Sequence, residues 1–232
     1  MNTEQYNSLK GRVRGAVLED GDAGYDEARV IWNGMMDKKP RVIVRCSGVV
    51  DVIEAVNSAR ETKLEIAVRG GGHNVAGNAV CDDGMMIDLS LMKAVKVDPV
   101  ARTAWVQGGA QLGDLDRETQ MFGLVAPAGV VSDTGVAGLT LGGGTGWVSG
   151  KYGLTVDNLL SVNIVTAEGK YIKASDNENP ELFWGLKGGG GNFGVATSFE
   201  FALQDLGPEV MRCMVMYAED DAQNILANWR EV

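Results

Sequence analysis

The chain has 232 residues, of which 45% are hydrophobic and 22% are charged, and its formal net charge is −10 at pH 7. This length and composition predict a soluble globular protein with one large domain or two small ones. The acidic balance argues against nucleic-acid binding, which needs a basic surface, and against attraction to an anionic membrane.

The cysteine and histidine content argues against a disulfide framework and against a zinc site. Cys46, Cys81 and Cys213 are odd in number, far apart and without metal-ligand spacing, and His73 is the only histidine. The first 15 residues hold no apolar core of signal-peptide length, and no run of 18 apolar residues occurs. We therefore expect a reduced, cytoplasmic protein.

The first half of the chain predicts short strands around one long helix. Residues 42–46 are rich in β-branched side chains, and Val52, Ile53, Val56 and Ala59 recur with helical spacing. In chain order we expect a helix over 6–14, a strand over 42–46, a helix over 49–62, and strands over 65–70, 86–89, 94–98 and 103–107.

The second half continues with strands in runs. We expect a helix over 110–123, a hairpin over 159–175 with its turn near Glu168, a helix starting at Pro180 with Asn179 as its cap, and a strand over 195–203. The stretch 139–154 is too rich in glycine for a stable helix on propensity alone. Strands outnumber helices without strict alternation, which favours an α+β fold over a doubly wound parallel sheet.

The tail begins a new unit after Gly207. We expect a strand over Met211–Tyr217 and a helix over Asp220–Trp229. One strand and one helix cannot bury a core alone, so residues 207–232 are interpreted as the opening of an incomplete second domain.

Glycine accounts for 32 residues, and much of it lies in three clusters, at 70–72, 142–146 and 188–194. Such clusters indicate close backbone approach or positive φ angles. The first follows a predicted strand, and its freed amides can converge on a phosphate. A sharp turn is the alternative, but the small residues Ala76, Gly77 and Ala79 keep the surface bare for longer than a turn requires.

His73 directly follows the first cluster. It can be a surface histidine, a hydrogen-bond donor to phosphate, or a nucleophile towards an electrophilic cofactor, since neutral imidazole is available near neutral pH. The residue type alone leaves these alternatives open.

The other two clusters carry weaker signals. Gly189-x-Gly191-x-x-Gly194 matches the dinucleotide fingerprint in its letters, but here a helix precedes it and a strand follows, so a nicotinamide site is rejected. The cluster at 142–146 fits either tight helix packing or a bare surface beneath a flat ring. Three bare surfaces in one domain fit a long ligand such as a dinucleotide.

Residues 39–203 resemble a known family. The segments "PRVIVRCSGVVDVIEAV", "VRGGGHN", "GLTLGGGTGWVSGKYGLTVDNL" and "ELFWGLKGGGGNFGVATSFEF" occur in the order found in FAD-linked oxidases with a p-cresol-methylhydroxylase-type FAD domain, in the berberine-bridge-enzyme-like branch. The resemblance implies an FAD-binding domain over 39–206, made of two α+β subdomains with FAD between them. An N-terminal helix and lead-in segment over 1–38 would precede it.

The resemblance also implies how FAD is held. The loop 69–74 would bind the pyrophosphate, and His73 would be bonded to the flavin 8α carbon. Val131 stands where many members have a second, cysteinyl link, and Leu139 where plant members often have histidine, so the pattern is closer to bacterial singly linked oxidases. The cofactor-binding residues implied are Arg69, Gly70, Gly71, Gly72, His73, Asn74, Val75, Val131, Asp133, Thr134, Gly135, Gly138, Leu139, Gly142, Gly143, Gly144, Trp147, Asn158, Gly194 and Val195.

The activity implied is transfer of a hydride from a C–H bond beside nitrogen or oxygen of a small molecule to FAD, with dioxygen as acceptor and hydrogen peroxide as product. No catalytic residue is assigned, because the substrate domain is largely missing. The alternative is a catalytically incomplete flavin-binding module, or one chain of a split oxidase. A non-covalent reductase of cell-wall precursors is a third reading, disfavoured by His73. We expect self-association or a partner chain to cover the flavin face.

Overall fold

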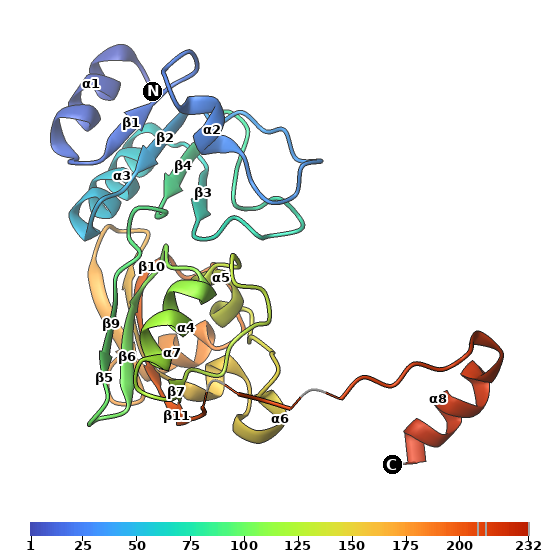
Figure 1. The fold of residues 1–232 in the computed structure, drawn as a ribbon. Helices are drawn as coiled ribbons and strands as arrows, with labels where there is room; N and C mark the ends of the chain where they lie inside the picture. Colours follow the sequence, from blue (N-terminus) through green and yellow to red (C-terminus); the bar gives the residue numbers. More distant parts are fainter. Residues whose placement is uncertain (208, 212, 232) are drawn as a thin grey trace.

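The computed structural model describes residues 1–207, 209–211 and 213–231. Two α+β bodies lie one above the other in Figure 1, each built around its own sheet. We call them the first and the second subdomain, and the chain passes from one to the other between β4 (Met85–Asp88) and β5 (Val95–Asp98). The predicted α+β class is confirmed.

The first subdomain holds a four-stranded sheet in the order β1-β2-β4-β3, in which β2, β4 and β3 run parallel and β1 is antiparallel. Every residue of β4 is buried, as expected for a central strand covered on both faces. Helix α1 contacts α3, and α2 contacts β2. The other bounds are β1 Ala16–Leu18, β2 Val42–Arg45, β3 Ile66–Arg69, α1 Thr3–Arg12, α2 Tyr25–Arg29 and α3 Val49–Thr62.

The second subdomain holds a five-stranded antiparallel sheet in the order β5-β6-β10-β8-β9. Its main core joins the sheet to α4, α5 and α7 through residues such as Leu115, Leu141, Phe183 and Phe199. The bounds are β6 Thr103–Gln107, α4 Leu112–Gln120, β7 Leu124–Val125, α5 Val136–Leu141, α6 Ser149–Tyr152, η1 Thr155–Asn158, β8 Leu159–Val165, β9 Tyr171–Ser175, α7 Pro180–Leu186, β10 Val195–Ala202 and β11 Gln204–Asp205.

Most predicted elements form where the sequence places them. Helix α3 covers the predicted residues 49–62, and the hairpin over 159–175 is present as β8 and β9. Asn179 is the N-cap residue of α7, but its side chain donates to the carbonyl of Lys173 instead of capping the helix. The glycine-rich stretch 139–154 is helical only at its two ends, in α5 and α6.

The predicted strand Met211–Tyr217 is wrong for the residues that the structure describes. Met211 and residues 213–217 have no regular structure, and Arg212 lies outside the described residues. Alternating apolar residues form a strand only when a neighbouring strand accepts their hydrogen bonds, and no described strand lies beside them. The predicted helix is present as η2 (Glu219–Asp221) and α8 (Ala222–Glu231), and none of its described residues is buried.

A buried carboxylate fixes the first subdomain around the start of α3. Asp51 accepts hydrogen bonds from the amides of Arg14, Gly15 and Ser47 and from the Ser47 hydroxyl, at 2.8 to 3.1 Å. Burial opposes ionisation of Asp51, but these donors outweigh it and lower its pKa. Asp51 thereby joins the N-terminal segment, the end of β2 and α3.

Replacing Asp51 with asparagine should lower the free energy of unfolding by about 3 kcal/mol, because asparagine cannot accept all four bonds. A lowered folded-state pKa stabilises the native state above the unfolded value of about 3.9, and this contribution is lost as the pH falls through the folded value. Urea unfolding of both proteins from about pH 7 to pH 3 tests this, and the difference should shrink in acid. A pH-independent difference would exclude the ionised carboxylate as the source.

Candidate functional site

The first glycine cluster forms a loop that leaves β3 on the side of the second subdomain. Residues 70–77 follow Arg69, the last residue of β3. Two hydrogen bonds tie the N-terminal segment to this loop. The Trp32 amide donates to the Gly72 carbonyl at 3.1 Å, and the Asn33 side chain donates to the Val75 carbonyl at 2.7 Å. Contacts within the chain therefore hold the loop in place without a ligand.

Gly71 lies against Gly135 of the second subdomain. A Cβ built on Gly71 would lie 2.3 Å from the Gly135 nitrogen, and one built on Gly135 would lie 2.3 Å from the Gly71 nitrogen. Gly72, by contrast, needs glycine for its φ of +74°. The cluster thus combines a close backbone approach with a left-handed turn, the two uses of glycine that the sequence indicated.

His73 points into the boundary between the subdomains. Its ring stacks on Trp32, with centroids 5.4 Å apart and an interplanar angle of 22°. Its Nε2 atom lies 3.5 Å from Oδ2 of Asp133. The imidazole is therefore placed between an aromatic face from one subdomain and a carboxylate from the other.

The segment before α5 presents Asp133 on a well-anchored turn. The Leu112 amide donates to the Thr134 carbonyl at 2.9 Å, and the Gly113 amide donates to the Ser132 carbonyl at 2.8 Å. The Gln111 side chain donates to the Asp133 carbonyl, also at 2.9 Å. The start of α4 therefore fixes this turn opposite His73.

Helix α5 and the glycines after it leave bare backbone. A Cβ built on Gly138 or on Gly143 would meet no atom within 4 Å. Gly143 and Gly144 have φ angles of +111° and +76°, and Gly142 is the C-cap of α5. Leu139 packs against Gly129 and Gly144, so its side chain fills space inside the second subdomain.

Of the other predicted site residues, some make contacts within their own subdomain and some are exposed. Asn158 is buried, and its amide group donates to the carbonyls of Tyr152 and Leu154 while its oxygen accepts from Gln204. Gly194 packs on β8 and Val195 is buried at the start of β10. Asn74 accepts from the Asn78 amide and closes the turn after His73, while Val131 and Trp147 are exposed.

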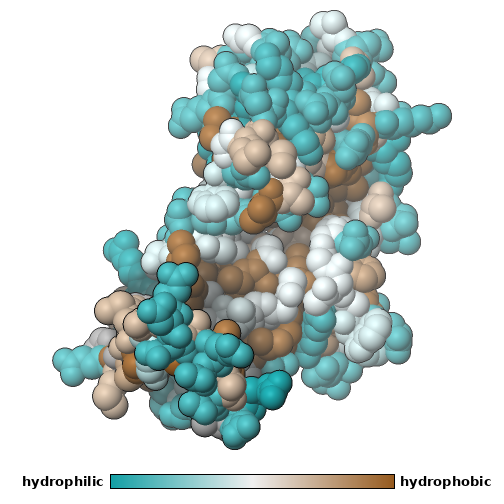
Figure 2. All heavy atoms as spheres, turned by 90° about the vertical axis from the view of Figure 1, so that its right-hand side faces the viewer, coloured by the Kyte–Doolittle hydropathy of each residue, from teal (hydrophilic) through white to brown (hydrophobic). Residues whose placement is uncertain are grey.

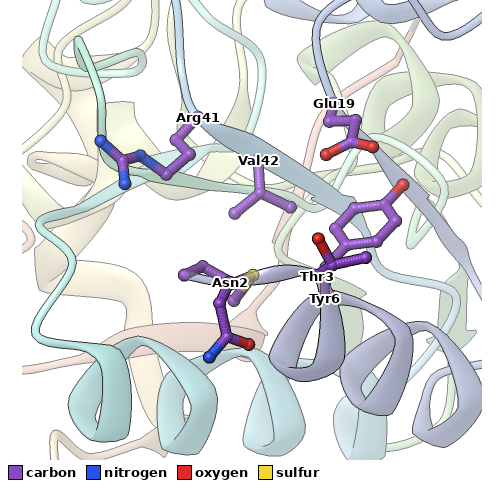
Figure 3. A pocket seen from close by; sticks show the side chains of 7 residues that line it. Asn2, Thr3, Tyr6, Glu19, Arg41 and Val42 are labelled. Carbon is purple, nitrogen blue, oxygen red and sulfur yellow. The ribbon is translucent and has the colours of Figure 1, made fainter.

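Two hollows are visible on the molecule. Figure 2 shows one between the two subdomains, walled by apolar and weakly polar residues. The other, of about 250 Å³, lies at the N-terminus between α1 and β2 (Figure 3). There the single Tyr6 hydroxyl hydrogen is shared between the Val17 carbonyl and the Asp22 carboxylate, and burial together with this bonding raises the pKa of Tyr6 to about 12. The Tyr6 hydroxyl therefore stays protonated near neutral pH.

Sequence reasoning missed two contributors to the site. Trp32 lies in a segment read as a lead-in, and no local pattern links it to His73. Gln111 is the N-cap residue of α4, and its contact with Asp133 spans 22 residues. Within the described residues no group of three metal-ligating side chains comes together, and no helix is both long and apolar enough to cross a membrane.

Comparison with known proteins identifies the family. Residues 40–175 match the model of an FAD binding domain family. The chain belongs to this family. Its relatives include (R)-6-hydroxynicotine oxidase of Paenarthrobacter nicotinovorans, which is 41% identical over 206 residues, covering 89% of this chain and 45% of the relative.

Solved structures agree in fold. The 6-hydroxy-D-nicotine oxidase of Arthrobacter nicotinovorans superposes with a TM-score of 0.82 and 42% identity, covering 83% of this chain and 43% of that one. BBE-like 1 of Physcomitrella patens superposes with a TM-score of 0.80 and 29% sequence identity, and the match covers 86% of this chain and 44% of that one. The fold is the α+β fold of FAD-linked oxidoreductases, as predicted, and the chain spans less than half the length of each of these three relatives.

The residues at the subdomain boundary fit an FAD molecule. The six successive backbone N–H groups of residues 71–76 donate to no acceptor in the part of the chain that the structure describes. The Nε atom of Arg69 is buried there without a hydrogen-bond partner. Six free amides in one loop suit a diphosphate, and the bare surface at Gly138 and Gly143 suits a flat ring.

Replacing Gly138 with alanine should separate folding from flavin binding. Alanine favours the helix, so the free energy of unfolding should rise by about 0.5–1 kcal/mol. The added methyl group would stand on the bare surface, so the flavin content of the purified protein should fall. Gly150→Ala is the matched control, since Gly150 is also helical with open space around it but lies in α6. Equal flavin content in all three proteins would remove α5 from the FAD site.

Proposed function

We propose that the chain binds FAD between its two subdomains and that a ring nitrogen of His73 forms one covalent bond to the flavin 8α carbon. The position of His73 supports this proposal. It is the only histidine of the chain, it directly follows the glycines 70–72, and it faces the second subdomain. Bond formation removes one hydrogen from the imidazole and one from the flavin 8α carbon, and these two hydrogens reduce dioxygen to hydrogen peroxide. Val131 offers no sulfur for a second link.

The reaction we propose is oxidation of a small molecule at a C–H bond beside nitrogen or oxygen, with dioxygen as the final acceptor. Hydride acceptance is the chemistry supplied by bound FAD. The amides of residues 71–76 would bind its diphosphate, and Gly138 and Gly143 would lie beneath its ring. The name of the nicotine oxidase relative supports an amine as substrate.

We further propose that self-association or a partner chain covers the flavin face. The chain spans about 45% of its nicotine oxidase relative, and α8 exposes Leu226 and Trp229 with none of its described residues buried. Exposed apolar surface of this kind favours association. Three unpaired cysteines support a reduced, cytoplasmic setting.

Size-exclusion chromatography with light scattering, run beside a peroxide-release assay on amines, alcohols and sugars, tests these proposals. We expect the 232-residue chain to associate and to turn over slowly or not at all. A strict monomer with brisk turnover would show that this chain builds a complete active site alone.

A further inference from the structure

We propose that Asp133 is a positioning residue for His73: its carboxylate holds the neutral imidazole with the proton on Nε2, so that Nδ1 is the nitrogen that bonds to FAD. This inference rests on the proposed function. In this proposal Asp133, from the second subdomain, sets the orientation of the His73 ring, from the first.

The contact itself selects the nitrogen. Oδ2 of Asp133 lies 3.5 Å from Nε2 of His73, within ion-pair distance, and neither ring nitrogen makes a hydrogen bond with the described residues. A carboxylate beside one imidazole nitrogen favours the tautomer that carries the proton there, and the lone pair is then on the other nitrogen. Trp32 covers one ring face and limits rotation of the ring.

Asp133 is suited to this role because its backbone is fixed while its side chain is exposed. The Gln111 side chain and the first amides of α4 hold the turn 132–134, and the Asp133 side chain is 62% exposed. An exposed contact of this kind contributes little to folding stability. Removal of the carboxylate should therefore change the imidazole and leave the turn in place.

The chemistry balances with this tautomer. The Nδ1 lone pair forms the bond to the 8α carbon, and that carbon loses a proton and two electrons. The Nε2 proton leaves towards Asp133 and solvent, so that imidazole becomes neutral again. The two electrons and two protons reduce dioxygen to hydrogen peroxide.

Nuclear magnetic resonance on the flavin-free protein tests the tautomer without any activity assay. His73 is the only histidine, so a chain purified without a histidine tag gives a single imidazole in a long-range proton–nitrogen spectrum. At about pH 8, where ordinary imidazole is neutral, we expect the proton on Nε2 in the wild type and a mixture of tautomers in Asp133→Ala. Ser132→Ala changes the same turn without removing a charge, and it should match the wild type.

The rate of covalent FAD incorporation, followed by intact mass, tests the consequence. We expect incorporation to slow by about tenfold or more in Asp133→Ala, to recover in part in Asp133→Glu, and to be unchanged in Ser132→Ala. Equal rates and equal tautomers in wild type and Asp133→Ala would overturn this inference alone. A wild-type chain that never links FAD would overturn the proposed function and this inference with it.

Discussion

Replacing His73 with alanine should leave no flavin on the polypeptide after denaturation in acid. The bond needs a ring nitrogen, and the chain contains no other imidazole. Flavin should still bind before denaturation, because the amides of residues 71–76 and the bare backbone at Gly138 are unchanged. Intact-mass analysis of native and acid-treated protein separates the two states.

Trp32→Leu is the matched control for the His73 variant. It removes the stacked ring but keeps the backbone bond from residue 32 to the Gly72 carbonyl. We expect this variant to retain the covalent bond. If His73→Ala keeps its flavin through denaturation, the attachment lies elsewhere in the chain.

Replacing Gly71 with valine should abolish flavin binding and separate the two subdomains. The new Cβ would lie 2.3 Å from the Gly135 nitrogen and 2.4 Å from its Cα, so the backbones must move apart. Forced overpacking of this kind costs about 1–3 kcal/mol, occasionally more. Flavin absorbance per mole of protein and urea unfolding measure the two effects.

Two further glycine variants calibrate the effect of Gly71→Val. Gly72→Ala tests the backbone angle alone, since the nearest atom to its Cβ would be 3.5 Å away but its φ is +74°. Gly11→Ala adds a methyl group in open space on α1 and should be harmless. Wild-type stability and full flavin content in Gly71→Val would mean that the loop does not pack on Gly135.

Local patterns in the sequence account for most of the secondary structure. The periodicity of 49–62 and the polar turn at Glu168-Gly169 involve residues close in the chain, and both elements form as predicted. The glycine loop and His73 are recognisable for the same reason. The residues that form the loop and the histidine lie within one short segment, residues 70–77.

The remaining features depend on contacts between distant residues. Strand β1 pairs antiparallel with β2 across a gap of more than 20 residues, and the sequence analysis did not predict it. Trp32 meets His73 across 41 residues, and the described residues of the strand-like segment 211–217 have no strand partner. A single sequence shows which residues are apolar, but it does not show what lies beside them.

The three clearest glycine positions illustrate this limit. Glycine is required at 71 by a neighbour 64 positions away and at 72 by its own φ angle, whereas a Cβ added to Gly138 would point into open space. Replacing glycine therefore has a different effect on stability at each of these positions, and only the fold shows which effect applies.

The most direct test of covalent attachment through His73 is whether flavin absorbance stays with the wild-type polypeptide after acid denaturation. We predict that it does, with one FAD per chain, and that peptide mapping places the flavin on the fragment containing His73. Complete release of flavin into the supernatant, or its recovery on a fragment without His73, would contradict a covalent bond between His73 and FAD.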